Sequence, residues 1–172
     1  MRHHANRGKH FETMLEVSNR HYRLKHVAHI RKTHPGVKFL LNKEGGVRKY
    51  WFEKSGGLDF IGTYTGRYLS FDAKSNKSKT AFPLKNVETH QIDELRRVEE
   101  FEGTSLLLIH FETLGKTYYL PSQAALDWAN QRERKSIPLS WFEGHTKEVV
   151  SKDGVLLDYL SIDADQIQTK TH

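Results

Sequence analysis

The spacing of apolar residues predicts three amphipathic helices. Apolar positions recur three or four residues apart over residues 9–25, from about 88 to 102, and from 123 to about 132, which is the repeat of one face of an α-helix. In the second segment the apolar stripe consists of Ile92, Leu95, Val98 and Phe101. Gly103 follows directly and is a typical helix stop.

Shorter apolar runs predict the strands, at residues 27–32, 37–42, 47–53, 68–74, 105–109, 116–120, 147–150 and 155–160. Glu44-Gly45-Gly46 and Asp153-Gly154 are strong turn sequences, so we expect a β-hairpin at each. The run 105–109 is almost continuously apolar, which is typical of a strand covered on both faces. Strands and helices alternate, so the pattern predicts an α/β fold with a mixed central sheet flanked by helices.

Length and composition fit one folded domain. The chain has 172 residues, of which 37% are hydrophobic and 28% charged, enough for one core. We expect a single domain over residues 1–172, with mobile ends at 1–8 and 163–172. The absence of cysteine excludes disulfides and thiolate metal sites. Because no apolar run reaches the roughly 20 residues that span a bilayer, we expect a cytoplasmic protein without a membrane partner.

An excess of basic residues favours a polyanionic partner. The formal net charge is +6 and the sequence pI is about 9.4, which suits nucleic acid. Basic residues gather in two regions, 20–32 and 74–85. From these regions the cations that we expect to contact DNA are Arg31, Lys32, Lys77, Lys79 and Lys85.

The strand at residues 68–74 carries the candidate chemistry. Its alternate residues face opposite sides: Leu69, Phe71 and Ala73 on one, and Ser70, Asp72 and Lys74 on the other, which we expect to be open. Asp59 precedes Asp72 by thirteen positions. Two converging carboxylates repel each other unless a cation lies between them, and their oxygens suit Mg²⁺. Such an ion can polarise a phosphodiester and lower the pKa of a bound water, which Lys74 can orient.

This combination of two acidic residues and a lysine is the pattern of the PD-(D/E)XK nucleases. The pattern is short, and Asp-x-Lys triplets are common at solvated strand ends. The predicted order of elements supports it: a helix, a strand, a strand bearing Asp59, a strand bearing Asp72 and Lys74, a helix and a strand. That order is expected of a restriction-endonuclease-like core.

Two other features have competing explanations. The densest histidines are His21, His26, His29 and His34; their spacing fits no zinc module, so we interpret them as surface or phosphate-contacting residues. Trp51 and Phe52 either pack in the core, which we favour for at least one of them, or lie on an exposed ribbon. On such a ribbon Tyr50 and Trp51 could stack on bases.

Longer motifs make the assignment more specific. They are Asn6-Arg7-Gly8 with Glu12, Asn19 and Tyr22; Asp59-Phe60-Ile61-Gly62 with Gly66; Phe71-Asp72-Ala73-Lys74; and Phe82-Pro83-Leu84 with Asn86, His90 and Gln91. Together they cover most of residues 6–120 and resemble the RecU-type Holliday junction resolvases. The resemblance implies a homodimeric endonuclease, dependent on Mg²⁺ or Mn²⁺, that nicks two opposed strands of a four-way DNA junction during recombination and repair. Recombination proteins of the host are further expected partners.

The resemblance also implies roles for single residues. Asp59 and Asp72 would bind the metal, with the Ala73 carbonyl as a further ligand, and Lys74 would position the attacking water or stabilise charge on the phosphorane. Gln91 would orient the site and Arg7 would contact DNA. Glu12, on the polar face of the first helix, is a candidate auxiliary metal ligand or organiser of the site.

The chain also departs from the family pattern. Members often have glutamate where Asp72 stands and threonine where this chain has Leu58. Residues 37–56 correspond to a protruding stalk that is thought to enter the junction centre, and we expect a short one here. Two alternatives stay open: another PD-(D/E)XK nuclease of the flap, nicking or restriction type, and a non-catalytic junction-binding modulator of recombination. Three retained catalytic-type residues argue against the second, because carboxylates facing phosphate weaken binding.

Overall fold

A five-stranded mixed sheet forms the centre of the fold in the computed structural model, which describes residues 5–34, 37–52, 57–131 and 133–163. The strands, in sheet order, are β1 (Ala28–Lys32), β4 (Phe60–Tyr64), β5 (Arg67–Asn76), β7 (Thr104–Phe111) and β8 (Lys116–Pro121). The β5–β7 pair is parallel and the other three pairs are antiparallel. The predicted α/β architecture with a mixed sheet is confirmed.

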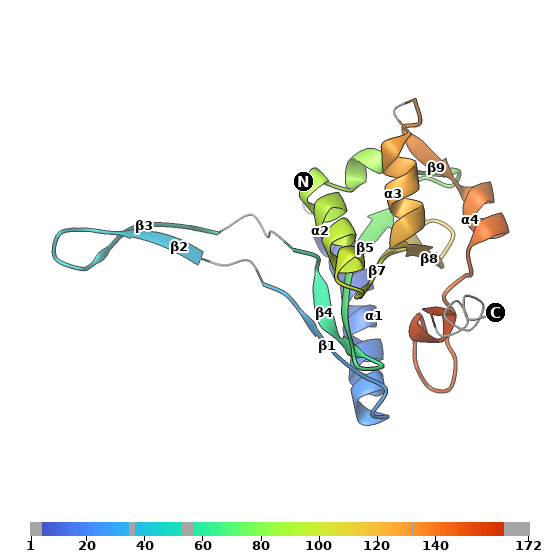
Figure 1. The fold of residues 1–172 in the computed structure, drawn as a ribbon, viewed down its shortest axis with the longest axis horizontal. Coiled ribbons are helices and arrows are strands. Elements are labelled where there is room, and N and C mark those ends of the chain that lie inside the picture. The colour runs from blue at the N-terminus through green and yellow to red at the C-terminus, as the bar shows by residue number, and fades with distance from the viewer. Residues whose placement is uncertain (1–4, 35–36, 53–56, 132, 164–172) are drawn as a thin grey trace.

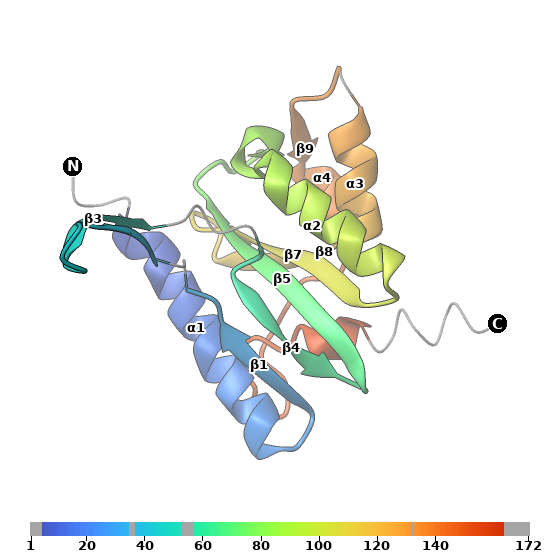
Figure 2. The ribbon, with the colours of Figure 1, turned by 60° about the vertical axis from the view of Figure 1, so that its left-hand side comes forward.

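Helices cover both faces of this sheet (Figures 1 and 2). Helix α1 (Ala5–Leu24) packs Phe11, Leu15 and Tyr22 into one core cluster together with β5 and β7. Helices α2 (Thr89–Glu100) and α3 (Ser122–Asn130) pack into a second cluster on the opposite face. That second face also holds η1 (Leu84–Asn86), the short pair β6 (Ala81–Pro83) and β9 (Ser136–Pro138), and α4 (Leu139–His145).

Strands β2 (Val37–Leu41) and β3 (Val47–Phe52) form a separate antiparallel hairpin that projects away from the body (Figure 1). We call it the stalk. Every residue of β2 is exposed, and Tyr50 is 66% and Trp51 41% exposed. Trp51 does not pack in the core, because a two-stranded ribbon has no second layer to bury its faces. The expectation that at least one of Trp51 and Phe52 is a core residue therefore rests on Phe52. The side chain of Phe52 lies outside the described residues.

The predicted hairpin over 147–160 is also wrong, although the turn at Asp153 and Gly154 exists, with both residues at positive φ. The segment makes only isolated bridges, Tyr118 with Glu148 and Lys152 with Val155. Residues 157–160 instead lie against α1, where Ser18 Oγ accepts a hydrogen bond from Leu157 N at 2.9 Å. The hydroxyl of Tyr22 donates to Asp158 Oδ1 at 2.8 Å and accepts from Leu160 N at 3.1 Å. We call this contact the C-terminal clasp.

The chain ends differ in part from expectation. Helix α1 begins at Ala5, so residues 5–8 of the segment expected to be mobile are helical. Asp163 is helical and buried; residues 1–4 and 164–172 lie outside the described part. Among the described residues, no helix combines the length and the apolar character needed to cross a bilayer.

Candidate active site

Strand β5 has the two-sided character that its sequence predicts. Leu69 and Phe71 are buried in the cluster beneath α1, and Ala73 packs against the same cluster. Asp72 and Lys74 point to the other side, where the Lys74 Nζ lies 2.7 Å from Asp72 Oδ2. This side is not open at Asp72, which is 0% exposed, because Gln91 of α2 lies over it. Lys74 keeps 18% of its side chain exposed and thus connects the buried carboxylate to the surface.

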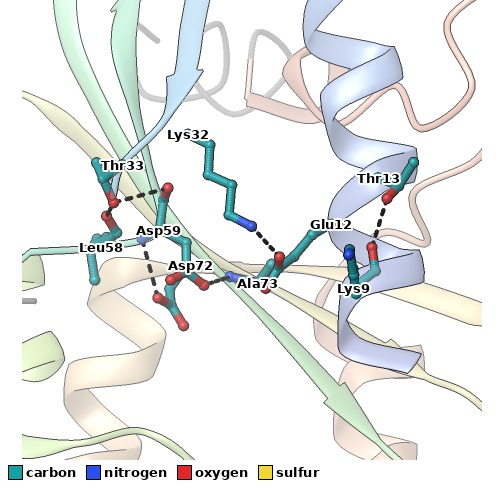
Figure 3. Close-up of polar contacts among 9 residues, drawn as sticks. All are labelled: Lys9, Glu12, Thr13, Lys32, Thr33, Leu58, Asp59, Asp72 and Ala73. Atoms are coloured by element: carbon teal, nitrogen blue, oxygen red, sulfur yellow. Dashed lines mark hydrogen bonds and ion pairs between the residues drawn. The ribbon is translucent and has the colours of Figure 1, made fainter. Parts of the chain in front are cut away.

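The β4–β5 pairing brings Asp59 to Asp72. The two strands are joined by a tight turn in which Thr65 and Gly66 have positive φ, and their register places Phe60 opposite Phe71. Asp59, one residue before β4, therefore lies beside Asp72: its N–H donates to Asp72 Oδ1 at 3.3 Å. In return, Ala73 N–H donates to Asp59 Oδ2 at 3.4 Å (Figure 3). The predicted convergence of the two carboxylates is confirmed.

Gln91 fixes the orientation of Asp72. Its Nε2 donates to Asp72 Oδ1 at 3.0 Å, while its Oε1 accepts from the backbone N–H of Glu88 at 3.0 Å. The second bond ties the amide to the first turn of α2 and leaves its NH₂ group facing the carboxylate. The helix start thus determines which oxygen of Asp72 is engaged.

The charges at this site are not balanced. Burial, and then the neighbouring carboxylate of Asp72, raise the pKa of Asp59 to about 6. Asp72 Oδ2 is buried and forms an ion pair with Lys74 but accepts no hydrogen bond. Asp72 Oδ2 thus lacks a hydrogen-bond donor and lies near a second carboxylate whose pKa is raised. A divalent cation between the two carboxylates would stabilise both negative charges. Asp59 and Asp72 therefore fit a metal ion bound between them.

In the described part of the chain, Asp59 and Asp72 are not joined by a third acidic or histidine side chain that could complete a metal site. Within the described ranges, no three His, Asp or Glu side chains are grouped so that they could enclose a metal ion. Glu12 of α1 forms an ion pair with Lys32 of β1 (Figure 3), and Glu12 is the largest cause of the raised pKa of Lys32, to which Asp59 also contributes. Lys32 is thus engaged by Glu12 beside Asp59, and its contact with DNA stays a prediction. Glu12 and the Ala73 carbonyl as metal ligands stay predictions.

Thr33 is a residue of this site that the sequence did not indicate. Its Oγ1 donates to the carbonyl of Leu58 at 2.9 Å and its backbone N–H donates to the carbonyl of Asp59 at 2.8 Å. It holds the turn that presents Asp59, and no motif marks it because it acts through the pairing of β1 with β4. Leu58 is fully buried in the second core cluster.

The other predicted residues are dispersed. Lys77, Lys79 and Lys85 are exposed, the first two in the loop after β5 and the third in η1. Arg31 is exposed on edge strand β1, and the side chain of Arg7 lies outside the described residues. His26, His29 and His34 are exposed and His21 half-buried. Asn19 and Tyr22 belong to the core: Asn19 Oδ1 accepts from the Tyr159 hydroxyl, and Tyr22 forms the C-terminal clasp.

Comparison with known proteins identifies the family of this chain. Residues 6–164 match the family described as RecU, Recombination protein U. A Holliday junction resolvase RecU of Streptococcus equi subsp. zooepidemicus is 34% identical over 151 residues, covering 84% of this chain and 75% of that protein. The Geobacillus kaustophilus protein of the same name is 32% identical over 166 residues, covering 92% and 83%. The structure of Archaeoglobus fulgidus Hjc, a Holliday junction resolvase, aligns with a TM-score of 0.48 at 14% identity, over 83% of this chain and 91% of that one. With a family match that spans nearly its whole length, this chain belongs to the RecU family.

Proposed function

We propose that this protein is a metal-dependent endodeoxyribonuclease that resolves four-way DNA junctions. One observation carries the proposal: Asp59 and Asp72 converge beside Lys74 at the surface end of a buried strand. A purely structural ion pair would need one acid and one base. A second, partly buried carboxylate with a raised pKa suits cation chemistry instead. The names of the relatives supply the substrate.

Asp59 and Asp72 would hold Mg²⁺ or Mn²⁺, with the Ala73 carbonyl as a further ligand. The ion, when bound, supplies a water of lowered pKa and stabilises negative charge on the scissile phosphate. The chain prepares this site in advance, since Thr33 fixes the turn before β4 and Gln91 fixes the carboxylate of Asp72. Preformed geometry matters because hydrolysis needs the water in line with the leaving oxygen.

Lys74 would act on the charge that develops during the reaction. Its ammonium is paired with Asp72 yet partly exposed, so it can reach a phosphate lying over the end of β5. There it would orient the attacking water or stabilise the phosphorane. Gln91 donates to Asp72 and is a positioning residue for the metal site rather than a group that touches DNA.

A homodimer would explain paired nicks. A two-fold assembly presents two identical sites to a substrate that has near two-fold symmetry. The stalk and the cations Arg7, Arg31, Lys77, Lys79 and Lys85 would contact the junction, and recombination proteins of the host would be further partners.

The test is a cleavage assay on synthetic DNA. With Mg²⁺, the protein should nick a four-way junction symmetrically and cut a linear duplex of the same sequence far less. Asp72→Ala and the isosteric Asp72→Asn should bind the junction but not cut it. Asp93→Ala removes an exposed carboxylate of α2 and should cut normally.

The outcomes separate the alternatives. Equal cutting of duplex and junction would reject junction resolution and favour another PD-(D/E)XK nuclease. Binding without cutting in both Mg²⁺ and Mn²⁺ would favour the non-catalytic modulator of recombination.

A further inference from the structure

A basic groove runs between α1 and β1, on the side of the sheet opposite α2. It has a volume of about 370 Å³, and its charged lining consists of Arg20, Arg23, Arg31, Lys32 and one acid, Glu16, with His34 beside them. Glu16, Arg20 and Arg23 are spaced four and three residues apart, so α1 presents them on one face. We call this hollow the α1–β1 groove.

The arginines of the groove are not neutralised by the protein. In the part of the chain that the structure describes, Arg20, Arg23 and Arg31 form no ion pair. The exposed arginines of α2 differ, because Arg96 pairs with Asp93 at 3.2 Å and Arg97 pairs with Glu94 at 2.8 Å. Guanidinium groups gathered at one hollow without carboxylate partners have the charge and the donor geometry that phosphate requires.

The groove adjoins the candidate active site. Lys32 lines the groove and pairs with Glu12, next to Asp59 (Figure 3). Arg23 lies eleven residues after Glu12 in the same helix, which corresponds to about 16 Å along the helix axis. At 3.4 Å per nucleotide step this is the length of about five base pairs. A strand that lies at the two carboxylates and continues past Lys32 along α1 would therefore reach the arginines within about half a helical turn of DNA.

We propose that the α1–β1 groove binds the phosphate backbone of the DNA arm that leads away from the cleavage site, about five nucleotides from the scissile bond. The inference rests on the proposed function, because it takes the cut strand to lie at Asp59 and Asp72. Arg20 and Arg23 supply the phosphate contacts. Contacts of this kind fix the position of the arm without selecting a sequence.

The first experiment compares two matched pairs of arginines. Arg20→Ala/Arg23→Ala removes the groove cations, and Arg96→Ala/Arg97→Ala removes neutralised arginines of equal number from α2. Junction binding is measured in EDTA, without cleavage, from about 50 to 200 mM salt. The groove variant should bind at least about tenfold more weakly at physiological salt, and its slope of log Kd against log salt should fall by about 2, roughly 0.9 for each lost phosphate contact. The α2 variant should match wild type.

The second experiment locates the contact on the DNA. Single neutral methylphosphonates, placed about four to six nucleotides from the cut, should weaken binding of wild type and leave the groove variant unchanged. Unaltered thermal unfolding of the groove variant would show that its loss of binding is not a folding defect.

The results distinguish the two levels of the proposal. If wild type cuts junctions and the groove variant binds them with an unchanged salt slope, the groove inference is overturned and the proposed function stands; an acidic protein would then be the better occupant. If wild type binds no junction, both fail.

Discussion

At the scale of single residues, the two carboxylates of the site have different environments. Asp72 is fully buried, with an ammonium on one oxygen and an amide on the other. Asp59 is partly exposed, and its pKa is raised by burial and by the neighbouring charge of Asp72. Asp59 is therefore the carboxylate whose charge changes as the pH approaches neutrality, and the one that gains most from a cation.

Replacing Asp59 by Asn should stabilise the metal-free protein at neutral pH. The pKa of Asp59 in the folded state, about 6, lies above its ordinary value of 3.8. The stability associated with the protonated carboxyl is fully present below about pH 4 and is lost as the pH rises through about 6. We expect Asp59→Asn to raise the free energy of unfolding by about 1–2 kcal/mol at pH 7, a value reduced for solvent screening, and by almost nothing at pH 4.

Denaturant unfolding in EDTA at the two pH values checks this, with Asp93→Asn as the exposed control. Added Mg²⁺ should raise the melting temperature of wild type and not that of Asp59→Asn. A variant less stable than wild type at pH 7 would show that the Asp59 carboxylate is satisfied without metal.

The sequence could predict this site only in part. Alternation along residues 68–74 was enough to place Asp72 and Lys74 on one face, because a strand has a fixed period of two. Thr33 could not be found, since its contact with Asp59 depends on the register of β1 against β4. Gln91 was reached through family resemblance alone; nothing in a helical pattern shows that an amide at its start will face a carboxylate.

At the scale of elements, α1 does more than cover the sheet. Ser18, Asn19 and Tyr22 are buried polar residues that bind the segment 157–160. This explains why the predicted strand at 155–160 failed. Val155, Leu157 and Tyr159 alternate as in a strand, and their side chains are buried in the cluster beneath α1. The N–H groups of Leu157 and Leu160, however, donate to helix side chains, and the segment shares only single backbone bonds with residues 150–152 rather than a strand ladder.

Tyr22→Phe should weaken the C-terminal clasp without changing the rate of DNA cleavage. The change removes the hydroxyl that donates to Asp158 and accepts from Leu160, leaving a buried N–H without its acceptor. We expect a loss of about 1–3 kcal/mol in the free energy of unfolding. Denaturant titration measures this loss of stability. The control is Val17→Ala, a substitution at a half-exposed residue of the same helix.

Junction cutting per folded molecule should stay at the wild-type level in Tyr22→Phe. A fall in cutting with unchanged stability would instead place Tyr22 in the active site.

At the scale of the whole molecule, the stalk is an exposed hairpin set apart from the body that carries the candidate active site (Figure 1). The turn Glu44-Gly45-Gly46 was sufficient to predict a hairpin, and Asn42 Oδ1 closes that turn by accepting from the N–H groups of Glu44 and Gly46. Its projection away from the body was implied by the family resemblance alone, because apolar residues such as Phe39 and Trp51 look like core residues in the hydrophobic pattern. They are 56% and 41% exposed, which is unusual for a protein without a partner.

Removing aromatic rings from the stalk should weaken junction binding selectively. Base stacking on an aromatic ring contributes about 1–3 kcal/mol, so Tyr50→Ala/Trp51→Ala should raise the Kd for a four-way junction at least about tenfold and change the Kd for linear duplex much less. The melting temperature should not change, since both side chains are exposed. Leu114→Ala, an exposed apolar residue in the turn between β7 and β8, is the control. Equal losses on both DNAs would remove the stalk from junction selection.

The route of the chain into and out of the stalk has a mechanical consequence. The hairpin is inserted between Thr33 and Asp59, and a backbone hydrogen bond of 2.8 Å joins these two residues at its base. A force on the hairpin would therefore be transmitted to Asp59, the proposed metal ligand. A DNA substrate that binds the hairpin without bending it would leave Asp59 in place. A substrate that bends the hairpin would displace Asp59, so DNA of the wrong shape would be cut more slowly.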